Sequence, residues 1–276
     1  MFLPFEQGNG LSKEVIMQAA AIAPSLDNAT STLTLGVVSY LNALPLYQTL
    51  RSRNSVHIRA AVPADLNRLL LTGGCDVAML PIVDYFRRVN HLRLISDACI
   101  ASDGETMTVR VFSRVPPDKV RRLWIDGHSH TSVILAQVIW RELYNVELEL
   151  QGGAMEDADS ILLIGDKVIG KLRNGFGFEV DLGAAWKHLT GLPFVFAAWC
   201  APKDKDLPAI SEMLAHARDE GVAAAETIAE MHAASHGWPK SIAVEYLCRT
   251  LKYKLTPAMR EAMDRFHALA EKYRLL

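Results

Sequence analysis

From Thr32 onward, short apolar runs rich in β-branched residues alternate with segments of helical periodicity, and this alternation constrains the fold more than any other feature. Strands separated by helices form βαβ units, in which the strands run parallel and helices cover both faces of the sheet. We therefore expect an α/β fold with a mostly parallel sheet. Strands are expected at 33–40, 57–62, 75–80, 106–113, 123–125, 146–150, 160–166 and 194–199, with helices at 46–52, 63–71, 81–89, 131–144 and 181–189.

The alternation falls into two blocks, and the chain from Leu207 to the end is almost entirely helical in pattern, with helices expected at about 207–219, 221–235, 239–250 and 257–273. Its last helix has a clear start signal, with Thr256 as the cap and Pro257 at the first helical position. Two blocks predict two lobes with a ligand cleft between them, hinged at 106–113 and 194–199, where the blocks join. The expected domains are an N-terminal extension at 1–32, lobe 1 at 33–112 and 197–276, and lobe 2 at 113–196.

Charge and cysteine content disfavour several classes of function. The chain has 29 lysines and arginines against 31 acidic residues, a net charge of −2, so it lacks the basic character of a nucleic-acid-binding protein. No apolar run reaches the ~20 residues of a membrane span, and the first residues lack the basic start of a secretory signal. The four cysteines have no metal-ligand spacing and suit reduced thiols, with a disulfide as the alternative. We expect a cytoplasmic protein that binds a small molecule and neither nucleic acid nor membrane.

Ligands of open α/β sheets bind beyond the carboxyl ends of strands, where helices begin. Asn42 directly follows the first strand, and its amide can both donate and accept hydrogen bonds there; the alternative is a turn or capping role. Asp76, Asp103 and Asp166 also lie near strand ends, but no spacing pairs them, so none is indicated as a general base. The chain contains no G-x-S-x-G, P-loop, G-x-G-x-x-G or H-E-x-x-H motif. The ligand is expected near Ser39–Asn42, Leu80-Pro81, 126–132 and Gly165-Asp166.

The sequence DGHSHTS places the hydroxyls of Ser129, Thr131 and Ser132 at the start of a buried helix. Free amides and the helix dipole favour an anion at such a terminus, and hydroxyls add hydrogen-bond donors. The pattern predicts a carboxylate-binding site; the alternative is plain capping, which needs only one hydroxyl. His128 and His130 lack a third ligand at metal-binding spacing, so we expect no metal.

The string GVVSYLNALPL at 36–46 resembles the opening of the chorismate dehydratases of menaquinone biosynthesis, which act in the futalosine route. Further matches follow in order and extend the resemblance from about residue 33 to the C-terminus. They are CDVAMLPIVDY (75–85), ASDGETMTVRVFSR (101–114), SHTSV (129–133), DADSILLIGDKVI (157–169) and DLGAAWKHLTGLPFVFAAWCA (181–201).

The resemblance implies a two-lobed periplasmic-binding-protein-like fold of type II with a helical C-terminal segment. It also implies a cytoplasmic enzyme that eliminates water from chorismate to give 3-[(1-carboxyvinyl)oxy]benzoate, without a metal or organic cofactor. Carried over by motif, the family's catalytic asparagine is Asn42. The substrate-binding residues implied are Ser39, Tyr40, Thr108, Ser129, Thr131 and Ser132.

The chain departs from the family pattern at three positions. His130 stands where Arg or Lys is common, Thr108 stands where Ser is usual, and Arg110 occupies a position that is usually aliphatic. Arg110 shares a strand face with Thr108 by period-two alternation, so it is either a carboxylate partner or a residue of the hinge surface. These departures bear on substrate contacts more than on the type of reaction.

The scarcity of candidate acids and bases suits a dehydration that yields an aromatic ring. Aromatisation supplies the driving force, so the protein mainly positions and desolvates the substrate. We expect the substrate's own enolpyruvyl carboxylate to remove the C3 proton, unless Asp103 or His128 lies within reach of C3. Two alternatives remain: an enzyme like the sister 1,4-dihydroxy-6-naphthoate synthase, or a solute-binding protein for a small carboxylate without catalysis.

Overall fold

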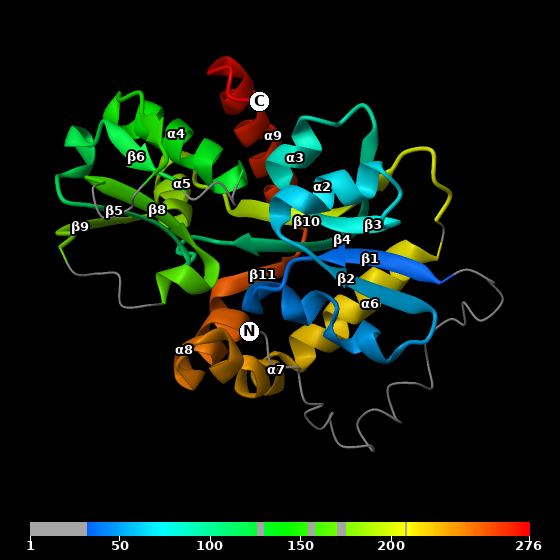
Figure 1. Cartoon of the computed structure of the whole chain (residues 1–276). Helices are drawn as coiled ribbons and strands as arrows, with labels where there is room; N and C mark the ends of the chain where they lie inside the picture. Colours follow the sequence, from blue (N-terminus) through cyan, green and yellow to red (C-terminus); the bar gives the residue numbers. More distant parts are fainter. Residues whose placement is uncertain (1–31, 126–129, 154–157, 170–174, 208) are drawn as a thin grey trace. The chain divides into compact units, whose positions relative to one another are not determined.

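The computed structural model describes residues 32–125, 130–153, 158–169, 175–207 and 209–276. Two β-sheets organise this part of the chain, one of six strands and one of five (Figure 1). The six-stranded sheet has the order β11-β4-β10-β3-β1-β2 and the five-stranded sheet the order β7-β6-β8-β5-β9. No helix among the described residues is long and apolar enough to cross a membrane.

The six-stranded sheet is mixed, so the expectation of a mostly parallel sheet is wrong. β1 pairs in parallel with β2 and β3, but β10 runs antiparallel to both β3 and β4, and β11 runs antiparallel to β4. The cause is connectivity: β10 returns from the second sheet and β11 follows the C-terminal helices, so neither belongs to a βαβ crossover. The strands are β1 (Leu33–Val37), β2 (Val56–Ala60), β3 (Val77–Pro81), β4 (Leu92–Ser102), β10 (Phe194–Pro202) and β11 (Leu251–Lys254).

The five-stranded sheet is mixed in the same way. β6 is parallel to β7 and β8, whereas β5 is antiparallel to β8 and β9. Helix α4 (His130–Tyr144) packs here and is buried over most of its circumference, as its apolar pattern predicts. The strands are β5 (Val109–Ser113), β6 (Arg122–Trp124), β7 (Glu149–Gln151), β8 (Ser160–Ile164) and β9 (Phe178–Asp181).

The chain passes between the two sheets at other residues than the expected lobe boundaries. The expected boundary at 112/113 falls inside β5, and the one at 196/197 falls inside β10. β5 pairs only with strands of the five-stranded sheet and β10 only with strands of the six-stranded sheet. The chain therefore passes from one sheet to the other at 103–108, and back through α5 (Leu182–Thr190) and the turn that follows it.

Short helices cover the first sheet. Two 3-10 helices, η1 (Leu41–Leu46) and η2 (Gln48–Ser52), follow β1 where a helix at 46–52 was expected. Helix α6 (Ile210–Ala223) packs on η1 at Gly221, where any Cβ would lie only 1.8 Å from the carbonyl oxygen of Pro45. This contact fixes η1, which carries Asn42. Helices α2 (Pro63–Leu71) and α3 (Ile82–Phe86) follow β2 and β3.

The C-terminal segment is helical apart from one strand that the sequence pattern did not reveal. α7 (Ala225–His232) and α8 (Lys240–Glu245) precede a π-helical turn at Tyr246–Thr250, which leads directly into β11. The last helix, α9 (Pro257–Lys272), begins as predicted, because the Thr256 side chain accepts a hydrogen bond from the Met259 amide. The expected helix at 239–250 therefore changes character at Tyr246.

One apolar core is shared by both sheets. Trp186 of α5, Phe194 of β10 and Phe266 of α9 meet edge to face, with ring centroids 4.9–5.7 Å apart. The same core contains Trp140 of α4 and Ala101 of β4, so strands and helices of both sheets contribute to it. Burial of these side chains supplies most of the stabilisation that holds the cavity walls in place.

Candidate active site

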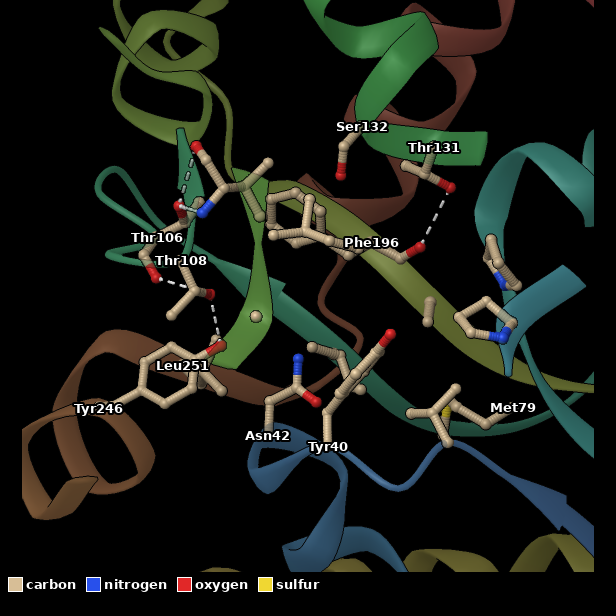
Figure 2. A pocket seen from close by; sticks show the side chains of 18 residues that line it. Tyr40, Asn42, Met79, Thr106, Thr108, Thr131, Ser132, Phe196, Tyr246 and Leu251 are labelled. Atoms are coloured by element: carbon tan, nitrogen blue, oxygen red, sulfur yellow. Dashed lines mark hydrogen bonds between the residues drawn. The ribbon is translucent and has the colours of Figure 1, made fainter. Parts of the chain in front are cut away.

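A cavity opens where strand ends of both sheets meet the start of α4, and its space of about 710 Å³ is partly open to solvent (Figure 2). Its walls combine apolar side chains, among them Met79, Ile100, Ile164 and Phe196, with a few hydroxyls and one amide. None of the described residues that line it is charged. The polar side chains are Tyr40, Asn42, Thr106, Thr108, Thr131, Ser132 and Tyr246.

The β1–η1 junction presents Tyr40 and Asn42 to the cavity, as the sequence predicts. Both side chains rise from the same turn in Figure 2. The Asn42 Oδ1 atom is buried and has no hydrogen-bond partner, which is costly for an amide oxygen unless a ligand supplies a donor. Ser39 was expected beside them, but it is exposed and does not line the cavity.

The turn before β5 presents Thr106 and Thr108 from the opposite wall. Asp181 holds this turn: its carboxylate accepts the backbone amides of Thr106 and Met107 and the Thr106 hydroxyl, at 3.0–3.1 Å. The same carboxylate caps α5 by accepting the amides of Gly183 and Ala184. These bonds hold Met107 at φ +61°, a left-handed conformation that is unfavourable for its side chain.

The start of α4 brings Thr131 and Ser132 to the cavity. The Thr131 hydroxyl accepts a bond from the Val83 amide at 3.3 Å and donates to the Phe196 carbonyl at 3.4 Å. Ser132 is buried and lines the cavity. Ser129, the third predicted hydroxyl, lies outside the described residues, as does His128.

His130 pairs with the buried carboxylate of Asp84 rather than lining the cavity. Its Nδ1 atom lies 2.7 Å from Asp84 Oδ1, and Arg87 lies 3.8 Å from the same oxygen. The hydrogen bond to Asp84 raises the pKa of His130 above its usual value, against the opposing effect of burial. His130 therefore carries its positive charge to higher pH than a free histidine.

The three acidic residues considered in the sequence analysis bind other side chains outside the cavity. Asp103 pairs with Lys187 at 2.6 Å, Asp76 pairs with Lys205 at 2.7 Å, and Asp166 accepts a hydrogen bond from Trp238 at 2.8 Å. None of the three lines the cavity. Among the described residues, no group of His, Cys, Asp or Glu could hold a metal ion.

Arg110 is also directed away from the cavity. It pairs with Glu179 at 2.9 Å and with Asp181 at 3.4 Å, both on the neighbouring strand β9. Arg110 therefore ties β5 to β9 and does not line the cavity, where a carboxylate partner of the ligand would lie.

Thr106 and Tyr246 line the cavity but were not among the site residues expected from the sequence, and Tyr246 is the more distant of the two from any predicted site segment. It sits at the first position of the π-helical turn, is 1% exposed, and its hydroxyl lies 2.7 Å from Thr108 Oγ1. Burial raises its pKa well above the usual range, and hydrogen bonding by Thr108 and Asn42 opposes that shift. Nothing in the local sequence distinguishes this tyrosine from a core residue of a helix.

Comparison with known proteins identifies the family. A family model described as menaquinone biosynthesis matches residues 33–272. The chain belongs to this family. A chorismate dehydratase of Thermus thermophilus is 31% identical over 234 residues, 77% of this chain and 86% of that protein. One of Campylobacter jejuni is 26% identical over 182 residues, 63% of this chain and 70% of that protein.

Solved structures show the fold of this family member independently. A protein of Archaeoglobus fulgidus superposes with a TM-score of 0.73 at 15% identity, covering 90% of this chain and 100% of that one. The periplasmic aliphatic sulphonate binding protein of Escherichia coli superposes with a TM-score of 0.63 at 12% identity, covering 90% and 89%. The predicted periplasmic-binding-protein-like fold is confirmed.

Proposed function

We propose that this protein is a chorismate dehydratase, which converts chorismate into 3-[(1-carboxyvinyl)oxy]benzoate and water. Family membership points to this reaction, and one observation of the cavity supports it above all. The described lining residues are uncharged, yet they include the buried and unpartnered Asn42 Oδ1. Such a cavity suits a substrate that brings its own base and needs to be oriented and desolvated.

The elimination needs no group that the cavity lacks. The enolpyruvyl carboxylate of chorismate takes the C3 proton, and the electrons of that C–H bond form the new C3–C4 double bond. The C4–O bond breaks, and the departing oxygen takes up the proton to leave as water. The ring becomes aromatic, which makes the step strongly favourable.

The lining of the cavity suits such a substrate by its polarity. Apolar residues such as Ile100 and Phe196 suit the ring. Ser132 and the first amides of α4 suit a carboxylate, because a helix N-terminus attracts anions. In this proposal Asn42, Tyr40, Thr108, Thr131 and Ser132 line the substrate site, and Asn42 and Ser132 contact the substrate directly.

Two broader features belong to the same proposal. We assign residues 33–102 with 194–276 to one lobe and 109–190 to the other, with the ligand between them. We also place the enzyme in the cytoplasm, since its four cysteines are free and three of them are buried, which suits a reducing compartment.

Incubation of the purified protein with chorismate tests the function. We expect the ultraviolet spectrum of chorismate to give way to that of an aromatic product lighter by one water, identified by mass spectrometry. A solute-binding protein would bind chorismate, seen by calorimetry, and return it unchanged. The sister activity would leave chorismate untouched. Either result would contradict the proposal.

A further inference from the structure

The hydroxyl of Tyr246 lies in the cavity wall between the two polar walls described above, and the proposed reaction does not use it. Its ring is held from behind by Trp238, stacked at 4.8 Å and 18°. Trp238 is in turn fixed by its bond to Asp166. The phenol is therefore rigidly placed, which is expected of a group whose direction matters.

In the hydrogen bond between Tyr246 and Thr108, Tyr246 is the donor and Thr108 the acceptor. The Thr108 hydroxyl has one proton and faces the Thr106 carbonyl at 3.4 Å, an oxygen that can only accept. Thr108 Oγ1 therefore accepts the proton of Tyr246 at 2.7 Å (Figure 2). The Tyr246 oxygen is left as an acceptor.

Asn42 completes the chain from the other wall. Its side chain hydrogen-bonds to Tyr246, and because its Oδ1 atom has no hydrogen-bond partner, this bond is made by its N–H group. The nitrogen therefore faces Tyr246, and the oxygen is the buried atom without a partner. The order of donation is Asn42 to Tyr246, Tyr246 to Thr108, and Thr108 to the Thr106 carbonyl.

This order decides what Asn42 offers to a ligand. Its Oδ1 atom accepts, so the ligand must bring a donor. At neutral pH both carboxylates of chorismate are ionised and only accept, and the C4 hydroxyl is the single O–H donor of the molecule. The hydroxyl that leaves as water is therefore the group that fits against Asn42.

We propose that Tyr246 is a positioning residue of the proposed dehydratase, orienting the Asn42 amide so that Oδ1 receives the C4 hydroxyl of the substrate. The inference rests on the proposed function. Without the phenol, the amide can turn its nitrogen toward the substrate and the ring loses its fixed rotation in the cavity, so C3–H and C4–O are no longer aligned for elimination.

The test uses the product, which lacks the C4 hydroxyl. Tyr246→Phe should lower kcat/KM for chorismate about tenfold, the effect of one hydrogen bond of ordinary strength. It should change the dissociation constant of 3-[(1-carboxyvinyl)oxy]benzoate by less than about twofold, because that ligand has no donor for Oδ1. A merely structural tyrosine would weaken both alike.

Tyr253→Phe is the matched control. Tyr253 is also fully buried, but its hydroxyl has no partner and it does not line the cavity, so both quantities should stay at their wild-type values. If Tyr246→Phe does not fold, Thr108→Val removes the next hydrogen bond in the series. It should likewise lower kcat/KM for chorismate and leave the dissociation constant of the product nearly unchanged. Wild-type kinetics in Tyr246→Phe, or equal losses for substrate and product, would overturn the inference. An inactive wild-type protein would instead refute the proposed function.

Discussion

The two polar corners of the cavity differ in what their hydrogen-bonding groups already contact. At the β1–η1 corner, the Asn42 oxygen is buried without a partner. At the α4 corner, the Thr131 hydroxyl both accepts from Val83 and donates to Phe196. A satisfied group stabilises the fold and gains little from a ligand, whereas an unsatisfied one weakens the empty protein and gains when a ligand arrives. The comparison separates residues that serve the reaction from residues that serve the scaffold.

Removing the unsatisfied group should have the largest effect on turnover. Asn42→Ala and Asn42→Asp should each lower kcat by about a hundredfold or more, as loss of a preorganised polar group does. The aspartate also places a negative charge before a dianionic substrate. The melting temperature should fall only slightly, since the lost oxygen had no partner and the lost amide N–H made a single hydrogen bond, to Tyr246. Steady-state kinetics and thermal unfolding measure both.

Asn67→Ala provides the control for that experiment. Asn67 also has a buried amide oxygen without a partner, but it lies on α2 and does not line the cavity. Its kcat should match that of the wild type. Near-normal turnover in folded Asn42→Ala would remove the distinction between the two corners.

The largest effect on stability should come from the residue that holds the Thr106–Thr108 turn. Asp181→Ala leaves several backbone amides without a hydrogen-bond acceptor and removes the cap of α5. The free energy of unfolding should therefore fall by about 2–3 kcal/mol. Activity should also fall, because Thr108 loses its placement. Denaturant unfolding checks this against Asp159→Ala, whose exposed pair with Arg122 should contribute less than ~1 kcal/mol. Equal losses in the two variants would contradict this account.

At the α4 corner, the two hydroxyl residues should have different effects when they are removed, one on substrate binding and the other on stability. Ser132→Ala should weaken substrate binding by about 1.5–3 kcal/mol, the value of a bond to a charged group. Thr131→Ala should instead lower stability by about 1 kcal/mol with little change in affinity, because its hydroxyl bonds the scaffold. Product affinity by calorimetry and unfolding by denaturant distinguish them. The opposite assignment would show that Thr131, and not Ser132, contacts the substrate.

The smallest effect should be electrostatic and dependent on pH. The pKa of His130 is raised in the folded protein, so its pairing with Asp84 contributes fully below the unfolded pKa near 6.5 and is lost as pH rises through the raised value. The stability difference between wild type and His130→Gln should therefore be largest at acidic pH and shrink toward alkaline pH. A difference that grows with pH would mean that His130 is held neutral.

Local sequence predicted the corner built from consecutive residues better than the one built by tertiary contacts. Tyr40 and Asn42 follow a strand end, which points them at a cleft in any open α/β sheet. Tyr246 reaches the cavity only because a π-helical turn precedes β11, and the pattern at 239–250 reads as plain helix. Spacing carries no signal for a contact 138 residues away, such as that with Thr108.

The strand β4 was missed for a related reason. Its eleven residues are mostly buried, yet Ser96 and Asp97 interrupt the apolar run, so it shows neither alternation nor continuous hydrophobicity. Asp97 is bonded by a residue far away in the sequence, Arg218 of α6. Without β4, the crossing at 103–108 could not be located from sequence.

The fluorescence of Trp238 should depend on whether the cleft is open or closed. Its indole nitrogen bonds Asp166, which follows β8 of the five-stranded sheet, while its ring stacks on Tyr246 beside β11 of the six-stranded sheet. A motion that separated the two sheets would remove a carboxylate from the indole and unstack two aromatic rings, and both changes alter indole emission. The protein thus carries an intrinsic fluorescence reporter of cleft opening, one side chain away from the cavity it would report on.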